Sequence, residues 1–238
     1  MGLFEKTWQL NQRYNVILLF VLALIVSLIA VFNAQDDNLK NIFISISAGL
    51  IIALIQFGLS WYEYITIDKY RRMGIKNIYD NKYKEEMYGE KIKNAKQKIY
   101  LMGNTAGKFL EDFANVSSRT SAKQVLIEKL EKGVEVRILV GAKHIFDGQE
   151  KRLRDYADAQ EIVSRLRDKY PNFECKYYSH EPAHSIFIFD NECFIGPIFS
   201  GISSFDIPFI HMYNESEFAS NYIEYFNEEW NKANCDDN

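Results

Sequence analysis

The chain has 238 residues, of which 47% are hydrophobic and 25% are charged, and its formal net charge is -4 at pH 7. This length allows one or two domains, and the acidic balance argues against a chain that binds nucleic acid over its whole surface. The three cysteines stand at no metal-ligand spacing, which fits packing roles in a reducing compartment and excludes a zinc site built on cysteine.

Two uncharged segments near the N-terminus, residues 15–35 and 41–62, are predicted to be transmembrane helices. A helix of about 22 residues reaches roughly 33 Å, which is enough to cross a hydrocarbon core of about 30 Å. Buried helices of a soluble protein are the alternative, but the short charged loop between the segments argues against it.

The basic residues that flank the two segments predict their orientation. Lys6 and Arg13 precede the first segment and four basic residues between positions 69 and 76 follow the second, whereas the connecting loop carries two aspartates and one lysine. Lys and Arg are enriched on cytoplasmic flanks. We therefore expect a two-pass protein of the cell inner (cytoplasmic) membrane, in contact with the lipid bilayer, with both termini in the cytoplasm.

Two flanking segments are expected to lie at the membrane surface. Residues 1–14 form an interfacial leader with Trp8 and Tyr14 as anchors, or else a disordered leader. Residues 63–90 form a basic juxtamembrane linker: from Lys69 to Lys98 there are ten lysines and arginines against four acids. Such a segment is attracted to anionic headgroups, and a nucleic-acid groove is the alternative.

Residues 91–238 alternate strand-like and helix-like patterns, which predicts an α/β layered domain. We expect strands at 98–103, 134–140, 174–178, 184–189 and 192–195. We expect helices at 85–95, around 109–113, and at 121–132, 149–170 and 216–233. The aromatic stripe of the last helix, Phe218, Tyr222, Tyr225, Phe226 and Trp230, is expected to be core or a dimer interface.

The most informative stretch is Pro182 to Pro197, which reads as a β-hairpin with His184 at the entry to its first strand. With the strand at 134–140 before it and a closing helix ending at Trp230, this part resembles one half of the phospholipase D superfamily. The resemblance covers roughly residues 91 to 233. It implies that the two transmembrane helices are followed by a phospholipase D-like α/β sandwich domain in the cytoplasm.

In that family the hairpin carries His-x-Lys followed by four residues and Asp, in which the histidine attacks phosphorus and the lysine holds the phosphate charge. His184 matches the histidine, Ile186 stands in the lysine position, and Asn191 stands in the aspartate position with Asp190 one place earlier. The resemblance implies His184 and Asp190 as catalytic residues if the domain is active. His184, Asn191 and His211 are the candidate ligand-binding residues, with a packed histidine as the alternative for His211.

An isoleucine cannot neutralise phosphate charge, so the resemblance implies a catalytically degenerate domain. Activity would need Lys143, His144, His180 or His211 to reach His184. Family enzymes place two such histidines face to face, and this chain has one copy of the hairpin, so we expect a homo-oligomer with an isologous interface. No sequence pattern calls for a cofactor or a metal.

The preferred function is a membrane-anchored effector or sensor, similar in layout to bacterial anti-phage effectors of retron or cyclic-nucleotide systems that damage the inner membrane. A protein or a nucleic-acid-containing partner would regulate it. One alternative is a membrane-tethered phosphodiesterase, a phospholipase or a nuclease, active as a dimer. The other is a membrane scaffold that recruits a cytosolic complex.

Overall fold

In this computed structural model of the protein, the described residues are 3–80, 85–116, 118, 120–199 and 207–235, and side chains are described from Tyr14 onward. The chain divides into two compact units, Met1–Lys69 and Tyr70–Asn238.

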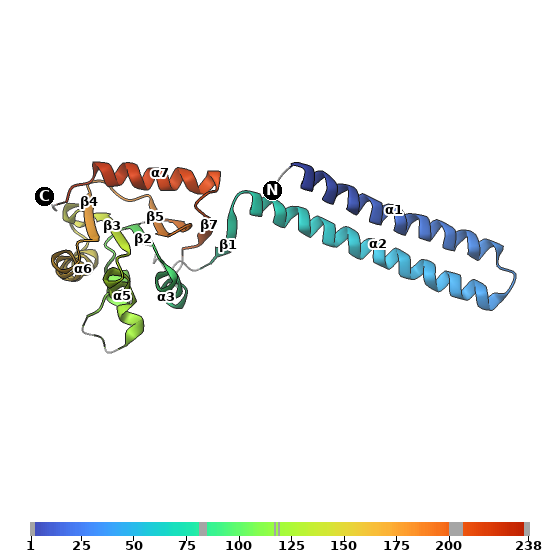
Figure 1. Ribbon diagram of the computed structural model, residues 1–238, viewed down its shortest axis with the longest axis horizontal. Helices are drawn as coiled ribbons and strands as arrows, with labels where there is room; N and C mark the ends of the chain where they lie inside the picture. The colour runs from blue at the N-terminus through green and yellow to red at the C-terminus, as the bar shows by residue number, and fades with distance from the viewer. Residues whose placement is uncertain (1–2, 81–84, 117, 119, 200–206, 236–238) are drawn as a thin grey trace. The chain divides into compact units, whose positions relative to one another are not determined.

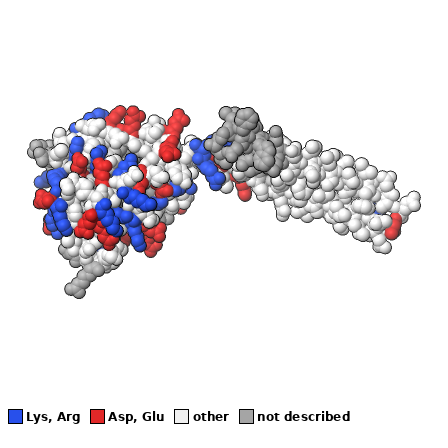
Figure 2. Space-filling view, in the orientation of Figure 1, with Lys and Arg blue, Asp and Glu red and all other residues white. Residues whose placement is uncertain are grey.

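The first unit is a pair of long helices, α1 (Leu3–Asn33) and α2 (Asp37–Arg72). Both are long and apolar enough to cross a membrane, and only 6% of the residues in each apolar window are buried. Figure 2 shows a surface almost free of charged side chains along this unit. Both predicted segments are helical, whereas their crossing of a membrane stays a prediction. α2 continues ten residues beyond the expected end at position 62.

One polar contact links α1 to α2 in the middle of their apolar lengths. The hydroxyl groups of Ser27 and Ser47 are 2.9 Å apart, and Ser27 also donates to the carbonyl of Phe43 at 3.1 Å. These hydrogen bonds join the two helices where they lie side by side, in contrast to Ser45, whose hydroxyl donates to the Asn41 carbonyl of its own helix. The backbone of the predicted leader belongs to α1 from Leu3, whereas its side chains, Trp8 included, lie outside the described residues.

The second unit is built on a seven-stranded sheet with the order β1-β7-β6-β5-β2-β3-β4. The strands β2, β3 and β4 are parallel to one another, and all other neighbours are antiparallel. The strands are β1 (Ile75–Tyr79), β2 (Lys98–Gly103), β3 (Glu135–Gly141), β4 (Phe173–Tyr178), β5 (His184–Phe189), β6 (Glu192–Pro197) and β7 (Phe209–Tyr213).

Helices cover both faces of this sheet (Figure 1). One face packs under α7 (Glu217–Lys232), whose Phe226 and Trp230 lie against Ile186, Ile188 and other buried side chains. The opposite face packs against the remaining helices through a larger, aromatic core. These helices are α3 (Glu85–Asn94), α4 (Gly107–Phe113), η1 (Ser121–Gln124), α5 (Val125–Glu131), η2 (Lys143–Phe146) and α6 (Glu150–Lys169).

The structure corrects the expectation of a linker at residues 63–90. Its first ten residues belong to α2, β1 forms an edge of the sheet by antiparallel pairing with β7, and its end belongs to α3. The compact unit therefore begins at Tyr70 rather than at residue 91. Neither β1 nor β7 was predicted from the sequence, because each is five residues long and gains its stability from pairing with a segment far along the chain.

Candidate functional site around His184

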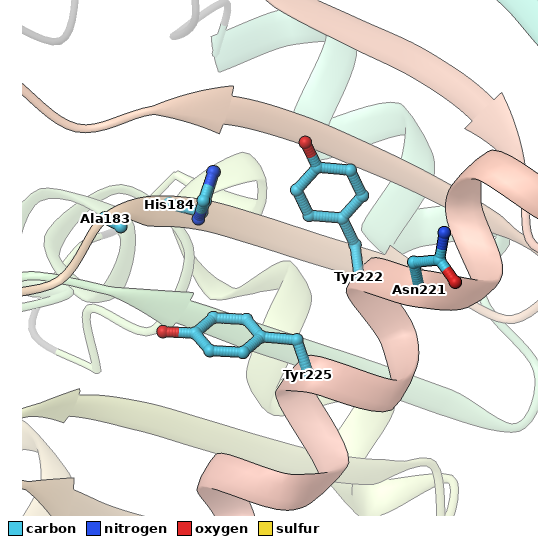
Figure 3. A pocket seen from close by; sticks show the side chains of 5 residues that line it. All are labelled: Ala183, His184, Asn221, Tyr222 and Tyr225. Carbon is cyan, nitrogen blue, oxygen red and sulfur yellow. The ribbon is translucent and has the colours of Figure 1, made fainter.

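His184 is the first residue of β5 and faces α7. Its ring meets the ring of Tyr222 edge-on at 5.2 Å and that of Tyr225 at 6.1 Å between centroids. A shallow hollow of about 310 Å³ lies between them, and Ala183 and Asn221 complete its described lining (Figure 3). The histidine is therefore presented at the surface between two tyrosines of one helix.

A second hollow of about 300 Å³ shares His184 and Tyr222 with the first and extends over the ends of β6 and β7. Its other described lining residues are Ile78, Ile195, Gly196, Pro197, Pro208, Phe209 and Ile210. Among the described residues that line either hollow there is no Lys, Arg, Asp or Glu.

The apolar surroundings set the charge state of His184. Burial lowers its pKa below the ordinary value of 6.5, and no charged residue acts against that effect. The imidazole is therefore neutral at pH 7, with one nitrogen that can donate a hydrogen bond and one that can accept. This chemistry suits a neutral polar ligand better than a phosphate.

Ile186 occupies the position of the family's lysine. It lies two residues after His184 on the same face of β5, with its side chain 0% exposed in the core beneath α7. Because successive side chains of a strand alternate between faces, a lysine here would point into that core. The position offers no surface at which a phosphate could be held.

Asp190 lies at the other end of β5 from His184, roughly 20 Å along the strand. Its carboxylate accepts backbone hydrogen bonds from Lys96, Gln97 and Lys98 at 2.8, 2.9 and 3.0 Å. Burial opposes its ionisation, but these three donors outweigh burial and lower its pKa. Asp190 is thus bound to the start of β2, and the structure does not bring it to His184.

Asn191 and His211 are also apart from His184. Asn191 is an exposed turn residue, and its carbonyl accepts from the amide of Asn214 at 2.9 Å. His211 is 5% exposed and stacks on Phe194, with the ring centroids 4.1 Å apart, on the sheet face opposite to α7. The three predicted ligand-binding residues therefore do not form one site.

His211 belongs to an ionic cluster around Glu192 that sequence reasoning missed. Glu192 pairs with Lys76 of β1 and Lys91 of α3 and accepts from His211 at 3.1 Å. Burial opposes its ionisation, but these donors lower the pKa of Glu192 to about 2. Burial lowers the pKa of His211 to about 4, so a neutral imidazole donates to the carboxylate. The cluster ties β1 and α3 to β6.

The groups that activity would need in place of the missing lysine do not line the described hollows. Lys143 and His144 are exposed in η2. His180 stacks on Tyr178 at 5.0 Å and bonds through Nε2 to Glu229 of α7 at 2.5 Å. Its other nitrogen faces the carbonyl of Glu181 at 3.0 Å, so both ring nitrogens meet acceptors, which favours the charged imidazolium.

The pair formed by His180 and Glu229 makes stability depend on pH. The hydrogen bond to Glu229 raises the pKa of His180 above 6.5, so its contribution is complete below pH 6.5 and is lost as the pH rises through the folded-state pKa. Burial opposes the ionisation of Glu229, but the hydrogen bonds from His180 and Lys232 lower its pKa below 4.5, so its contribution is lost only in more acidic solution. The contact stabilises most between pH 4.5 and 6.5.

We expect His180→Ala to destabilise the full chain by about 1 kcal/mol or less at pH 5.5, because the imidazole is half-exposed. At pH 9 the loss should be smaller. Thermal unfolding in detergent at both pH values measures the difference, with His144→Ala as the control at an exposed histidine. An equal loss at both pH values would contradict the charged pair.

Tyr222, Tyr225 and Asn221 are the site residues that sequence reasoning did not assign. The aromatic stripe of the closing helix was a visible signal, but its periodicity does not tell which members face the core. Phe226 and Trp230 are buried, whereas the two tyrosines lie half-buried beside His184. In the described part of the chain, no three His, Cys, Asp or Glu side chains are grouped so that they could hold a metal ion.

Comparison with known proteins gives no family: no family model matches the sequence, and no curated protein matches it. Among solved structures, the chain is similar to TrmBL2, an archaeal chromatin protein with a novel mode of DNA binding, with 16% identity and a TM-score of 0.45. That match covers 85% of this chain and 72% of TrmBL2.

The chain is also similar to Nuc from Salmonella typhimurium, a phospholipase D family member, with 14% identity and a TM-score of 0.45. This match covers 68% of the chain and 96% of Nuc. Neither likeness assigns the chain to a family.

Proposed function

We propose that the chain is a membrane-anchored effector or sensor with a catalytically inactive phospholipase D-like domain, which perturbs the bacterial inner membrane when it is triggered. Defence against phage is the role that fits this layout. Segments 15–35 and 41–62 cross the membrane, and both termini lie in the cytoplasm. The trigger is a protein or a nucleic-acid-containing partner.

The observation that carries the proposal of an inactive domain is the buried Ile186, two residues after His184. Hydrolysis of a phosphodiester needs a positive group at the phosphate, and loss of one such electrostatic donor costs about 10²- to 10³-fold in rate. The lysine position is closed by α7, and the described lining of the hollows contains no cation that could replace it. A neutral His184 in an apolar hollow supports binding rather than phosphoryl transfer.

The exposure of α1 and α2 supports the membrane anchor. Large apolar side chains such as Leu19, Val26 and Ile52 are 67%, 65% and 57% exposed. A helix in the core of a soluble protein would bury them, because each such side chain gains about 1.5–3 kcal/mol on leaving water. Lipid, or further copies of the helices in a homo-oligomer, would cover them.

The test is inducible expression in a bacterial host, with a membrane-potential dye and growth as readouts. We expect the wild type to depolarise cells, and we expect neither the purified wild type nor His184→Ala to hydrolyse a chromogenic phosphodiester. The variant Val26→Arg/Ile52→Arg places a charge near the middle of each span, which costs about 2.5–3.5 kcal/mol per charge, and should leave the membrane fraction and be harmless. The matched control Val26→Leu/Ile52→Leu should behave as the wild type.

Two results would contradict the proposal. If the purified wild type hydrolyses the phosphodiester and His184→Ala at an unchanged protein level does not, the domain is a working enzyme. If the membrane-bound wild type leaves the potential unchanged, the chain is not an effector, and the scaffold alternative gains support.

A further inference from the structure

A tight turn joins α2 to the sheet of the globular unit. Only Met73 and Gly74 separate the end of α2 from the start of β1. Gly74 is buried, with φ of +77°; its N–H donates to the carbonyl of Arg71 at 3.0 Å, and its carbonyl accepts from Tyr213 at 3.0 Å. Both hydrogen bonds lie within the globular unit, and they hold the backbone of Gly74 there.

The strand that follows the turn is also held in place. Lys76 of β1 pairs with Glu192, and its ammonium group lies 4.4 Å above the centre of the Tyr213 ring. β1 pairs with β7 at Ile75 and at residues 77–79, with an irregular register between Ile75 and Asn77. These contacts hold β1 in the sheet on the far side of the turn.

Gly74 touches the N-terminal cap of α7. A Cβ atom added to Gly74 would lie 2.1 Å from the Cβ of Ser216 and 2.6 Å from its Oγ. This Oγ accepts from the amide of Ala219 at 3.1 Å and donates to the carbonyl of Tyr213 at 2.9 Å. The turn after α2 thus packs without free space against Ser216, the N-cap residue of α7.

The same helix carries the tyrosines beside His184. Tyr222 and Tyr225 follow Ser216 by six and nine residues, which is roughly 9 to 14 Å along a helix. Tyr222 borders both hollows. An α-helix of this length is stiff, so a ligand that moves Tyr222 displaces the first turn of α7 as well.

We infer that the contact between Gly74 and Ser216 is a steric relay. It transmits a displacement of α7, caused by occupation of the hollow beside His184, to the last turn of α2. The role of this relay rests on the proposed function, since α2 must act on the membrane for the signal to matter. The contact itself can be tested without that assumption.

Hydrogen exchange of the full chain in lipid nanodiscs tests the relay. We expect Gly74→Ala to accelerate amide exchange about tenfold both in residues 216–222 and in residues 70–76, because the added methyl group forces the two segments apart. The matched control is Gly133→Ala. Gly133 has φ of +80° and open space around an added Cβ, so it carries the same backbone strain without a clash.

A second-site change tests whether the clash is the cause. Gly74→Ala/Ser216→Gly removes the opposing side chain and keeps a residue that is tolerated as a helix cap. It should remove the acceleration caused by the clash and leave an effect no larger than that of Gly133→Ala, which measures the backbone strain alone. The relay is wrong if Gly74→Ala affects α7 no more than Gly133→Ala does there, or if the double variant does not recover.

A substitution at the hollow tests transmission from α7 to the turn after α2. We expect Tyr222→Ala to accelerate exchange in residues 70–76, and Ser216→Gly to remove this effect, whereas Asn227→Ala on the exposed side of α7 should have none. Absence of the Tyr222 effect would overturn the relay. Depolarisation of cells tests the proposed function separately, so either idea can fail while the other stands.

Discussion

Ile186→Lys is expected to lower the stability of the globular unit by roughly 3–5 kcal/mol and to create no phosphodiesterase activity, although it restores the family's lysine. The side chain of Ile186 is fully buried among Met102, Ile195 and Phe226. An ammonium group placed there would be surrounded by apolar side chains, and burial of a charge in such surroundings is costly.

The three cysteines provide the measurement. Cys175 and Cys193 are buried and free in the globular unit, and Cys235 is exposed. In a Cys235→Ser background, a thiol-reactive dye therefore reports only the unfolding of this unit. The full chain in detergent is heated with the dye, and hydrolysis of a chromogenic phosphodiester is measured in parallel.

Ile186→Met is the matched control, because it preserves volume and should cost less than about 1.5 kcal/mol. A lysine variant with wild-type stability would mean that position 186 can open towards solvent. Stability combined with new hydrolysis would revive the enzyme alternative.

The first and last residues of an element could be predicted where its own sequence pattern marks both ends. β2 and β5 occupy 98–103 and 184–189 as expected, because both are apolar runs that turn residues or charged residues delimit. β1 could not be predicted in this way. Three of its five residues are exposed, and its lysine pattern resembles that of a surface linker. Its place is decided by β7 and by Glu192.

Of the residues around the hollow, sequence reasoning singled out only His184, because distance along the chain does not give distance in the folded protein. A motif read along the sequence places His184 and Asp190 six residues apart, but in an extended strand these positions are opposite ends of β5. His211 was expected beside His184, yet the alternation of side chains along β7 sends it to the other face of the sheet. The partners of His184 come from α7, and only tertiary packing identifies them.

Asp190→Ala is expected to destabilise the globular unit by roughly 2–5 kcal/mol. The change leaves three backbone N–H groups without their acceptor, which costs about 1–3 kcal/mol, and places an alanine at φ of 49°, where a left-handed backbone costs about 1–2 kcal/mol. Asp190→Gly removes the backbone strain, because glycine adopts a positive φ freely, and so measures the cost of the lost acceptor alone. The thiol-labelling assay measures both variants.

The pH dependence separates a structural carboxylate from a catalytic one. The pKa of Asp190 is lowered from 3.8 in the folded state, so its stabilisation is present above pH 3.8 and is lost as the pH falls through the folded value. The stability difference between wild type and Asp190→Asn should therefore be constant near neutral pH and should shrink in acid. If Asp190→Asn were as stable as wild type at pH 7 while losing a measurable hydrolytic activity, the carboxylate would serve chemistry rather than the hairpin, and the inactive-domain proposal would be wrong.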